Sequence, residues 1–141
     1  MELKITATPS QHDLDEIRLG LKAYNDQFFD ADVIKALGIF VVNEQGRKLA
    51  GLTGSTTGNW LRIDMLWVSE ALRGEGVGSR LIKAAEEEAR GRGCRFSQVD
   101  TASFQARPFY EKQGYQLRFS LDNYLHHYQR HYLTKALIEE P

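Results

Sequence analysis

The chain has 141 residues, a length typical of one domain with its own core, and we expect a single domain over residues 1–141. Hydrophobic residues make up 42% and charged residues 26%, which is usual for globular proteins and excludes a disordered or fibrous chain. The formal net charge of −1 disfavours a protein that binds nucleic acid through phosphate contacts. A single cysteine excludes a disulfide-stapled fold.

No apolar run is long enough to cross a membrane. The first residues also lack the basic start and apolar stretch of a secretory signal. We therefore expect a cytoplasmic location, with neither a membrane nor nucleic acid among the partners.

The first quarter of the chain predicts a strand, a helix and a loop. Apolar residues alternate over residues 2–8, as in a half-buried strand. Residues 11–26 carry apolar side chains at helical spacing, and Ser10 or Asp13 can cap this helix. Residues 25–32 are polar and aromatic and are predicted to form a loop or a broken second helix.

Three consecutive strands are expected next, over residues 38–42, 48–56 and 60–68. Turn sequences separate them, Asn43-Glu44-Gln45-Gly46 after the first strand and Gly58-Asn59 after the second. The three strands therefore predict an antiparallel meander.

The pattern changes after the meander. A glycine-rich turn precedes a helix over residues 77–92, and a strand follows over residues 96–101, so a βαβ crossover with a parallel strand pair is expected. A short helix over residues 104–113 and strands over residues 115–121 and 129–137 complete the chain. The predicted fold class is α/β (α+β), a mixed and mostly antiparallel sheet of about six or seven strands with a central parallel pair, flanked by helices.

Three glycines, Gly74, Gly76 and Gly78, lie between the last strand of the meander and the following helix. Glycine lets a ligand approach the backbone closely, and the first amides of a helix attract phosphate. The loop therefore predicts a phosphate or pyrophosphate site. It is not a P-loop, because the spacing and the lysine are missing, and it is one residue short of a dinucleotide fingerprint.

Two motifs carry a family resemblance. The sequence Arg73-x-x-Gly76-x-Gly78 matches the pattern R/Q-x-x-G-x-G/A, and Ala106-x-x-Phe109-Tyr110-Glu111-Lys112-x-Gly114-Tyr115 matches A-x-x-[FL]-Y-E-K-x-G-[FY]. In this order and spacing, over about residues 38–116, the chain resembles the GNAT family of N-acetyltransferases. The resemblance implies the GNAT-like acyl-CoA N-acyltransferase fold and no metal. It also implies transfer of an acetyl group from acetyl-CoA to a primary amine of a small molecule or protein, by direct attack in a ternary complex.

The resemblance also implies where acetyl-CoA binds. Its pyrophosphate would bind a set of backbone amides, with the basic side chain of Arg73 nearby. These amides are those of Gly74, Gly76, Val77, Gly78 and Ser79. Its pantetheine arm would pair with the backbone of Leu66, Trp67 and Val68, where the strands ending near Val68 and Thr101 splay apart. Ala106 and Tyr110 would contact it further along. Ser103 stands where the family commonly has asparagine, which puts a hydrogen bond from that position in doubt.

Three groups are candidates for the chemistry. Tyr110 aligns with the tyrosine that in the family points at the cofactor sulfur, and it would be the general acid; the alternative is a core aromatic residue. The backbone amide of Val68 would polarise the thioester carbonyl. Asp64 would be the base, because strand alternation places it on the side of its strand that approaches the thioester. The alternative is a structural acid paired with Arg62 or Arg118.

The acceptor side carries no motif. Aromatic and acidic side chains can line a pocket for a cationic amine, and the candidates are Phe28, Phe29, Asp30, Asp32 and Tyr124. The alternative for these residues is a solvated loop.

Two further residue types are assigned no role in the site. We expect His126, His127 and His131 to lie in a surface loop and strand, and Cys94 to be a buried small residue. Family members often form dimers, so a homodimer is also implied, although no hydrophobic seam indicates one.

Two other functions remain open at this point. One is a non-catalytic acyl-CoA-binding or sensing module on the same fold. The other is a nucleotide-phosphate enzyme that uses the glycine loop to bind ATP or NAD.

Overall fold

The computed structural model describes residues 1–30 and 33–138. These residues belong to two compact units, Met1–Val33 and Ile34–Pro141, and each unit is described by itself. The single domain expected over the whole chain stays a prediction. None of the helices within the described ranges is long and apolar enough to cross a membrane.

The first unit contains the α-helix α1 (Gln11–Asn25) among its described residues. Ser10 caps it: the Ser10 hydroxyl accepts a hydrogen bond from the Asp13 amide at 3.0 Å, and the Asp13 carboxylate accepts one from the Ser10 amide at 2.9 Å. This reciprocal pair is a capping box, and it uses both residues predicted for the cap. The strand predicted over residues 2–8 is wrong, because that segment has no strand conformation, and the described residues of its unit contain no other strand.

The second unit is built on one six-stranded sheet with the order β1-β2-β3-β4-β6-β5. Its strands are β1 (Ile34–Val42), β2 (Lys48–Thr57), β3 (Trp60–Val68), β4 (Phe96–Ala102), β5 (Gln116–Tyr124) and β6 (Tyr128–Ala136). Only β3 and β4 pair in parallel, and the other neighbours are antiparallel. The predicted mixed sheet with a central parallel pair is confirmed, with six strands.

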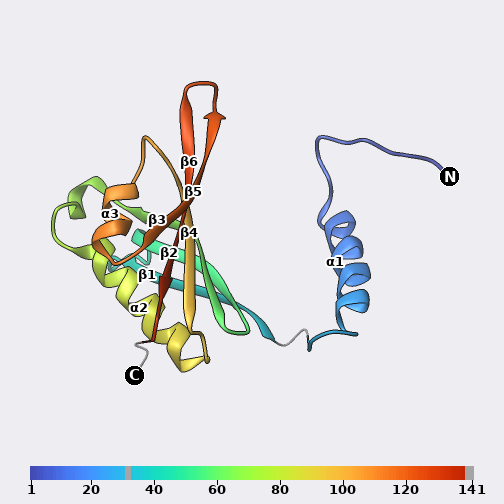
Figure 1. Ribbon diagram of the computed structural model, residues 1–141, viewed down its shortest axis with the longest axis horizontal. Helices are drawn as coiled ribbons and strands as arrows, with labels where there is room; N and C mark the ends of the chain where they lie inside the picture. The colour runs from blue at the N-terminus through green and yellow to red at the C-terminus, as the bar shows by residue number, and fades with distance from the viewer. Residues whose placement is uncertain (31–32, 139–141) are drawn as a thin grey trace. The chain divides into compact units, whose positions relative to one another are not determined.

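Three helical segments accompany the sheet: η2 (Glu70–Leu72), α2 (Val77–Gly91) and α3 (Arg107–Lys112). Figure 1 shows α2 and α3 on the same side of the sheet. Helix α2 turns a stripe of apolar residues to the sheet, and these are all 3% exposed or less: Leu81, Ile82, Ala85 and Ala89. Burying a leucine or isoleucine side chain stabilises a fold by about 1.5–3 kcal/mol, so this stripe fixes α2 on the sheet.

A buried polar network joins α2 to the sheet. Glu86 is 3% exposed, and its carboxylate lies 2.9 Å from Lys135 Nζ and accepts a hydrogen bond from the Tyr115 hydroxyl at 3.0 Å. The Tyr115 hydroxyl is also 2.8 Å from Ser97 Oγ. A carboxylate buried without partners would be strongly destabilising, so these contacts keep Glu86 compatible with the core.

The parallel pair is short. It runs from Trp60 opposite Phe96 to Ile63 opposite Val99 and then ends. Beyond that point β3 continues only beside β2, and β4 continues only beside β6. The two strands therefore part in their second halves, as the family resemblance implied, and one edge of β3 is left without a strand neighbour.

A bulge lies in β3 where the strands part. In the register of β2 and β3, Thr53 pairs with Met65 and Gly54 pairs with Ile63, so Asp64 has no partner in β2. The backbones approach closely there, because a Cβ atom on Gly54 would lie 2.1 Å from the carbonyl oxygen of Arg62. Glycine at position 54 is thus required by the bulge.

Gly54→Ala should therefore destabilise the protein, since the added methyl group can be accommodated only by moving the β3 backbone. We expect a loss of about 3 kcal/mol, at the upper end of overpacking effects, measured by urea denaturation. Gly91→Ala is the control, because its Cβ would meet no atom within 4 Å. Equal stability of the two variants would contradict this account of the bulge.

Candidate active site

The glycine loop between β3 and α2 has the backbone conformation that its sequence suggested. Gly74 has φ of 82° and Gly76 has φ of 76°. Both values lie in the left-handed region, which other residues adopt only at a cost. Gly76 is the N-cap of α2, so these two positions set the direction in which the chain enters the helix.

The first turn of α2 presents free amides. Among the described residues, none accepts a hydrogen bond from the amide N–H of Val77, Gly78 or Ser79, and no side chain caps the helix. These donors and the helix dipole favour an anion at this end of α2. The phosphate site itself stays a prediction.

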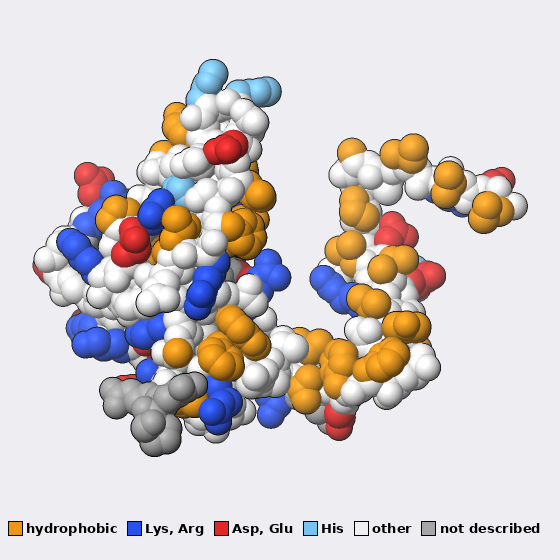
Figure 2. Space-filling model, in the orientation of Figure 1, with side chains coloured by type: hydrophobic (Ala, Val, Ile, Leu, Met, Phe, Trp, Pro, Cys, Tyr) orange, Lys and Arg blue, Asp and Glu red, His pale blue; other side chains and the backbone are white. Residues whose placement is uncertain are grey.

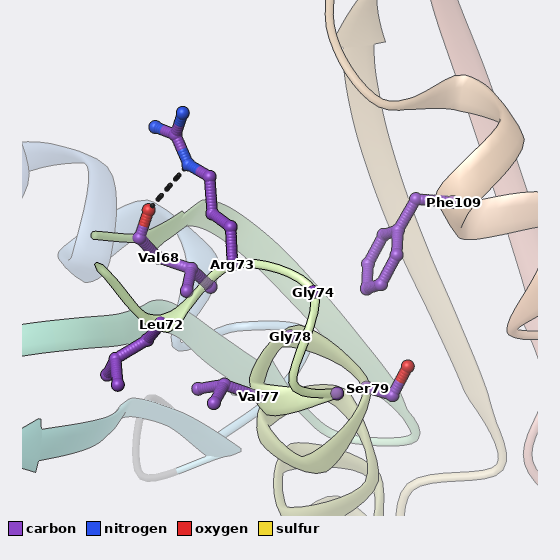
Figure 3. A pocket seen from close by; sticks show the side chains of 9 residues that line it. Val68, Leu72, Arg73, Gly74, Val77, Gly78, Ser79 and Phe109 are labelled. Atoms are coloured by element: carbon purple, nitrogen blue, oxygen red, sulfur yellow. Dashed lines mark hydrogen bonds between the residues drawn. The ribbon is translucent and has the colours of Figure 1, made fainter. Parts of the chain in front are cut away.

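A recess of about 360 Å³ opens beside these amides. Figure 3 shows Phe109 on one side of it and Leu72 and Val77 on the other, with the glycine loop between them. It is lined by Val68, Leu72, Arg73, Gly74, Gly76, Val77, Gly78, Ser79 and Phe109. Seven of these residues were predicted for binding; Leu72 and Phe109 were missed, although Phe109 lies inside the second motif.

The free edge of β3 faces the gap between the parted strands. The Ser69 amide donates to the Leu49 carbonyl at 2.9 Å, so the backbone groups of residues 67 and 69 point toward β2. By the alternation of an antiparallel pair, those of Leu66 and Val68 point into the gap. The Val68 carbonyl accepts a hydrogen bond there from Arg73 Nε at 3.2 Å (Figure 3). The backbone groups of Leu66 and Val68 are therefore open to a ligand, whereas those of Trp67 point toward β2.

Helix α3 holds the N-terminal end of α2 in place. The Phe109 ring lies against Gly78, where a Cβ atom would be only 3.2 Å from the ring. Next to it, Gln113 Nε2 donates a hydrogen bond to Ser79 Oγ at 2.8 Å. The two sequence motifs, some thirty positions apart, are therefore in direct contact.

Tyr110 lies in α3 and is 5% exposed. Burial, with a smaller contribution from the negative charge of Asp100, raises the pKa of Tyr110 to about 12. Its hydroxyl is therefore protonated at neutral pH. No group in the described part of the chain hydrogen-bonds this hydroxyl, which leaves its proton available to a ligand.

Two other residues of this region, Ala106 and Ser103, were also predicted to bind the cofactor. Ala106 is the N-cap of α3, and its amide donates to Thr101 Oγ1 at 3.3 Å. Ser103 is exposed, and its Oγ accepts a hydrogen bond from the Gln129 amide at 3.0 Å. Neither of them lines the recess beside the glycine loop.

Asp64 lies in the bulge, where simple strand alternation fails. Its carboxylate is 3.1 Å from Arg62 Nε, and both side chains are exposed. Leu66 and Val68, in contrast, pack against the hydrophobic core. The expectation that Asp64 shares their side is wrong, because the extra residue of the bulge shifts the alternation. The ion pair with Arg62, the alternative from the sequence, is present.

A cluster that the sequence did not reveal lies just past the point where β4 leaves β3. Asp100, one residue beyond Val99, forms an ion pair with Arg130 of β6. Arg130 also donates to the Tyr124 hydroxyl at 3.1 Å and lies over the Tyr124 ring. Arg130 is thirty positions from Asp100 in the sequence, so only the pairing of β4 with β6 brings them together.

The other predicted acceptor residues belong to the first unit. Phe28, Phe29 and Asp30 follow α1, and Asp32 lies outside the described residues. Tyr124 belongs to the second unit. The predicted acceptor pocket therefore stays a prediction.

The histidines and the cysteine that the sequence analysis discussed do not line the recess. Figure 2 shows histidine side chains at the tip of the β5–β6 hairpin, where His126 and His127 are exposed. His131 was expected at the surface, but it is 4% exposed, because it faces inward on β6 with its Nδ1 2.7 Å from Ser120 Oγ. Cys94 is buried as predicted. Within the described ranges, no group of three or more metal-ligating side chains is found.

Comparison with known proteins gives a consistent result. The sequence profile of the acetyltransferase (GNAT) family matches residues 7–115. Blasticidin-S acetyltransferase of Streptomyces morookaense is 40% identical over 77% of this chain and 80% of its own length. Acetyltransferase Atu2258 of Agrobacterium fabrum is 39% identical over 70% of this chain and 72% of its own. The crystal structure of an Agrobacterium tumefaciens acetyltransferase superposes with a TM-score of 0.89, at 32% identity, over 96% of this chain and 99% of that chain.

The raised pKa of Tyr110 predicts a loss of stability in alkaline solution. A tyrosine whose folded-state pKa exceeds its unfolded value of about 10 stabilises the fold fully below pH 10, and this contribution is lost as the pH rises toward 12. The free energy of unfolding should therefore fall from pH 9.5 to pH 11.5, and Tyr110→Phe should reduce that fall. Urea denaturation across this pH range measures the free energy of unfolding of the natural protein and of Tyr110→Phe. An identical pH dependence of the two would contradict the prediction.

Proposed function

Because the chain belongs to the GNAT family and is an acetyltransferase, we propose that it transfers an acetyl group from acetyl-CoA to a primary amine of a small molecule such as an antibiotic. The observation that carries the proposal is the recess at the start of α2. Free helix amides, two left-handed glycines and the open edge of β3 meet there. A protein that only senses acyl-CoA would need the same recess, so the protonated, unpartnered hydroxyl of Tyr110 supports the enzyme.

The residues present fit acetyl-CoA, which supplies the activated acetyl group as a thioester. The amides of Gly74, Gly76, Val77, Gly78 and Ser79 would bind the pyrophosphate. The guanidinium of Arg73 is exposed beside them, and only its Nε is used, on the Val68 carbonyl. The backbone of Leu66 and Val68 would pair with the amides of the pantetheine arm in the manner of an added strand.

Two groups of this chain would carry the chemistry. The Val68 amide points into the gap and would polarise the thioester carbonyl. Tyr110 would hold its proton at the hydroxyl until the CoA thiolate leaves and then donate it, because its pKa lies well above neutrality. Asp64 is not assigned the role of base, because it pairs with Arg62 on the exposed side of β3, away from the side of Leu66 and Val68.

The acceptor is the least constrained part of the proposal. The likeness to blasticidin-S acetyltransferase supports an antibiotic amine over a protein amine. The carboxylate of Asp100 and the ring of Tyr124 lie near the end of β4, and both contact Arg130, so a cationic amine would compete with this guanidinium for them.

The activity is tested with purified protein, acetyl-CoA and a panel of amines that includes blasticidin S. We expect release of free CoA thiol and an acceptor heavier by one acetyl group. Tight CoA binding without turnover of any amine would instead support the non-catalytic module. Binding of ATP or NAD in place of CoA would overturn the assignment of the loop to CoA.

Tyr110→Phe separates catalysis from binding. Loss of a general acid costs about 10²-fold or more, so kcat should fall by about 100-fold while the Kd for CoA, measured by calorimetry, stays within about two-fold. Tyr128→Phe is the control, since Tyr128 is exposed at the start of β6. Undiminished turnover in Tyr110→Phe would remove the acid role from this residue.

A further inference from the structure

The contact between Ser79 and Gln113 has a defined polarity. The amide nitrogen of Gln113 is a donor only, so in the 2.8 Å hydrogen bond it forms with Ser79 the hydroxyl oxygen is the acceptor. The hydroxyl carries one proton, and this proton is not used in the bond. In the part of the chain that the structure describes, no acceptor is found for it.

The position of Ser79 determines which acceptors can reach its hydroxyl proton. Ser79 is the third residue of α2, half-buried, and lines the recess beside the glycine loop. The amides of the same helical turn are donors and cannot accept its proton. A ligand that accepts from these amides is therefore also the natural acceptor for the Ser79 hydroxyl.

Gln113 itself is held firmly. It is the C-cap of α3, and its backbone amide donates to carbonyl oxygens of that helix. The same helix presses the Phe109 ring against Gly78. The side-chain amide therefore reaches Ser79 from a fixed support and not from a mobile loop.

We propose that Gln113 is a positioning residue for cofactor binding: by donating to Ser79 Oγ, it directs the Ser79 hydroxyl as a donor to the pyrophosphate of CoA. The inference rests on the proposed function, because it takes the ligand of the recess to be CoA. It adds to that function a residue outside the recess, acting through another side chain. No bond is made or broken, so the effect is on affinity alone.

Binding of CoA and of pantetheine, which lacks the pyrophosphate, tests the proposal. Ser79→Ala should weaken CoA binding about ten-fold, as expected for one hydrogen bond to a charged group. Gln113→Leu should weaken it about five-fold, and the double variant should match Ser79→Ala, because both changes remove one interaction. Calorimetry measures the Kd for CoA, and an NMR titration measures the Kd for pantetheine. The Kd for pantetheine should be unchanged in all variants.

Gln113→Glu tests polarity at nearly constant side-chain size. A carboxylate can only accept from Ser79, so it would take up the hydroxyl proton and place a negative charge near the phosphates. CoA binding should then be weakened at least as much as in Ser79→Ala. Gln116→Leu, an exposed glutamine three positions away, is the control for folding and should bind CoA like the natural protein.

Each contrary result has its own meaning. Wild-type affinity for CoA in Gln113→Leu or Gln113→Glu overturns the positioning role, and so do additive losses in the double variant. Equal weakening toward pantetheine means that Gln113 only supports the fold. If the natural protein bound no CoA at all, the proposed function would fail first, and the inference with it.

Discussion

β3 and β4 exchange hydrogen bonds only as far as Ile63 and Val99, and beyond these residues each strand keeps just its outer neighbour. The rest of the site depends on this separation. It turns the backbone groups of Leu66 and Val68 toward an open gap, and it lets the chain leave β3 into the glycine loop. The bulge at Asp64 bends β3 at the same place, and Gly54 on β2 leaves the space that the bend requires.

The two motifs form one structural unit, because α3 supports the start of α2. Phe109 packs on Gly78, and Gln113 holds Ser79, so the residues of the second motif fix the helix end that the first motif builds. A six-residue helix is too short to be stable alone. Its place is set by two buried tyrosines, Tyr110 within the helix and Tyr115 just after it.

Much of the fold could be predicted from local sequence, since turns and apolar spacing mark β2, β3, α2 and β4 to within a residue or two. The glycine loop was predicted for the same reason: its conformation is encoded in a few adjacent positions. What failed depends on partners distant in the sequence. The segment over residues 2–8 alternates but pairs with no strand among the described residues. The bulge at Asp64 shifts the alternation, and Asp100 meets Arg130 only through the order of the sheet.

The packing of Phe109 on Gly78 has a consequence for the evolution of this chain. A Cβ atom at position 78 would lie 3.2 Å from the Phe109 ring, a contact tight enough that the ring would have to shift by a few tenths of an ångström. Alanine at position 78 is therefore easier to accept where residue 109 is smaller or slightly displaced. Related sequences are therefore expected to vary at these two positions as a correlated pair, with the helix, not the cofactor, imposing the correlation.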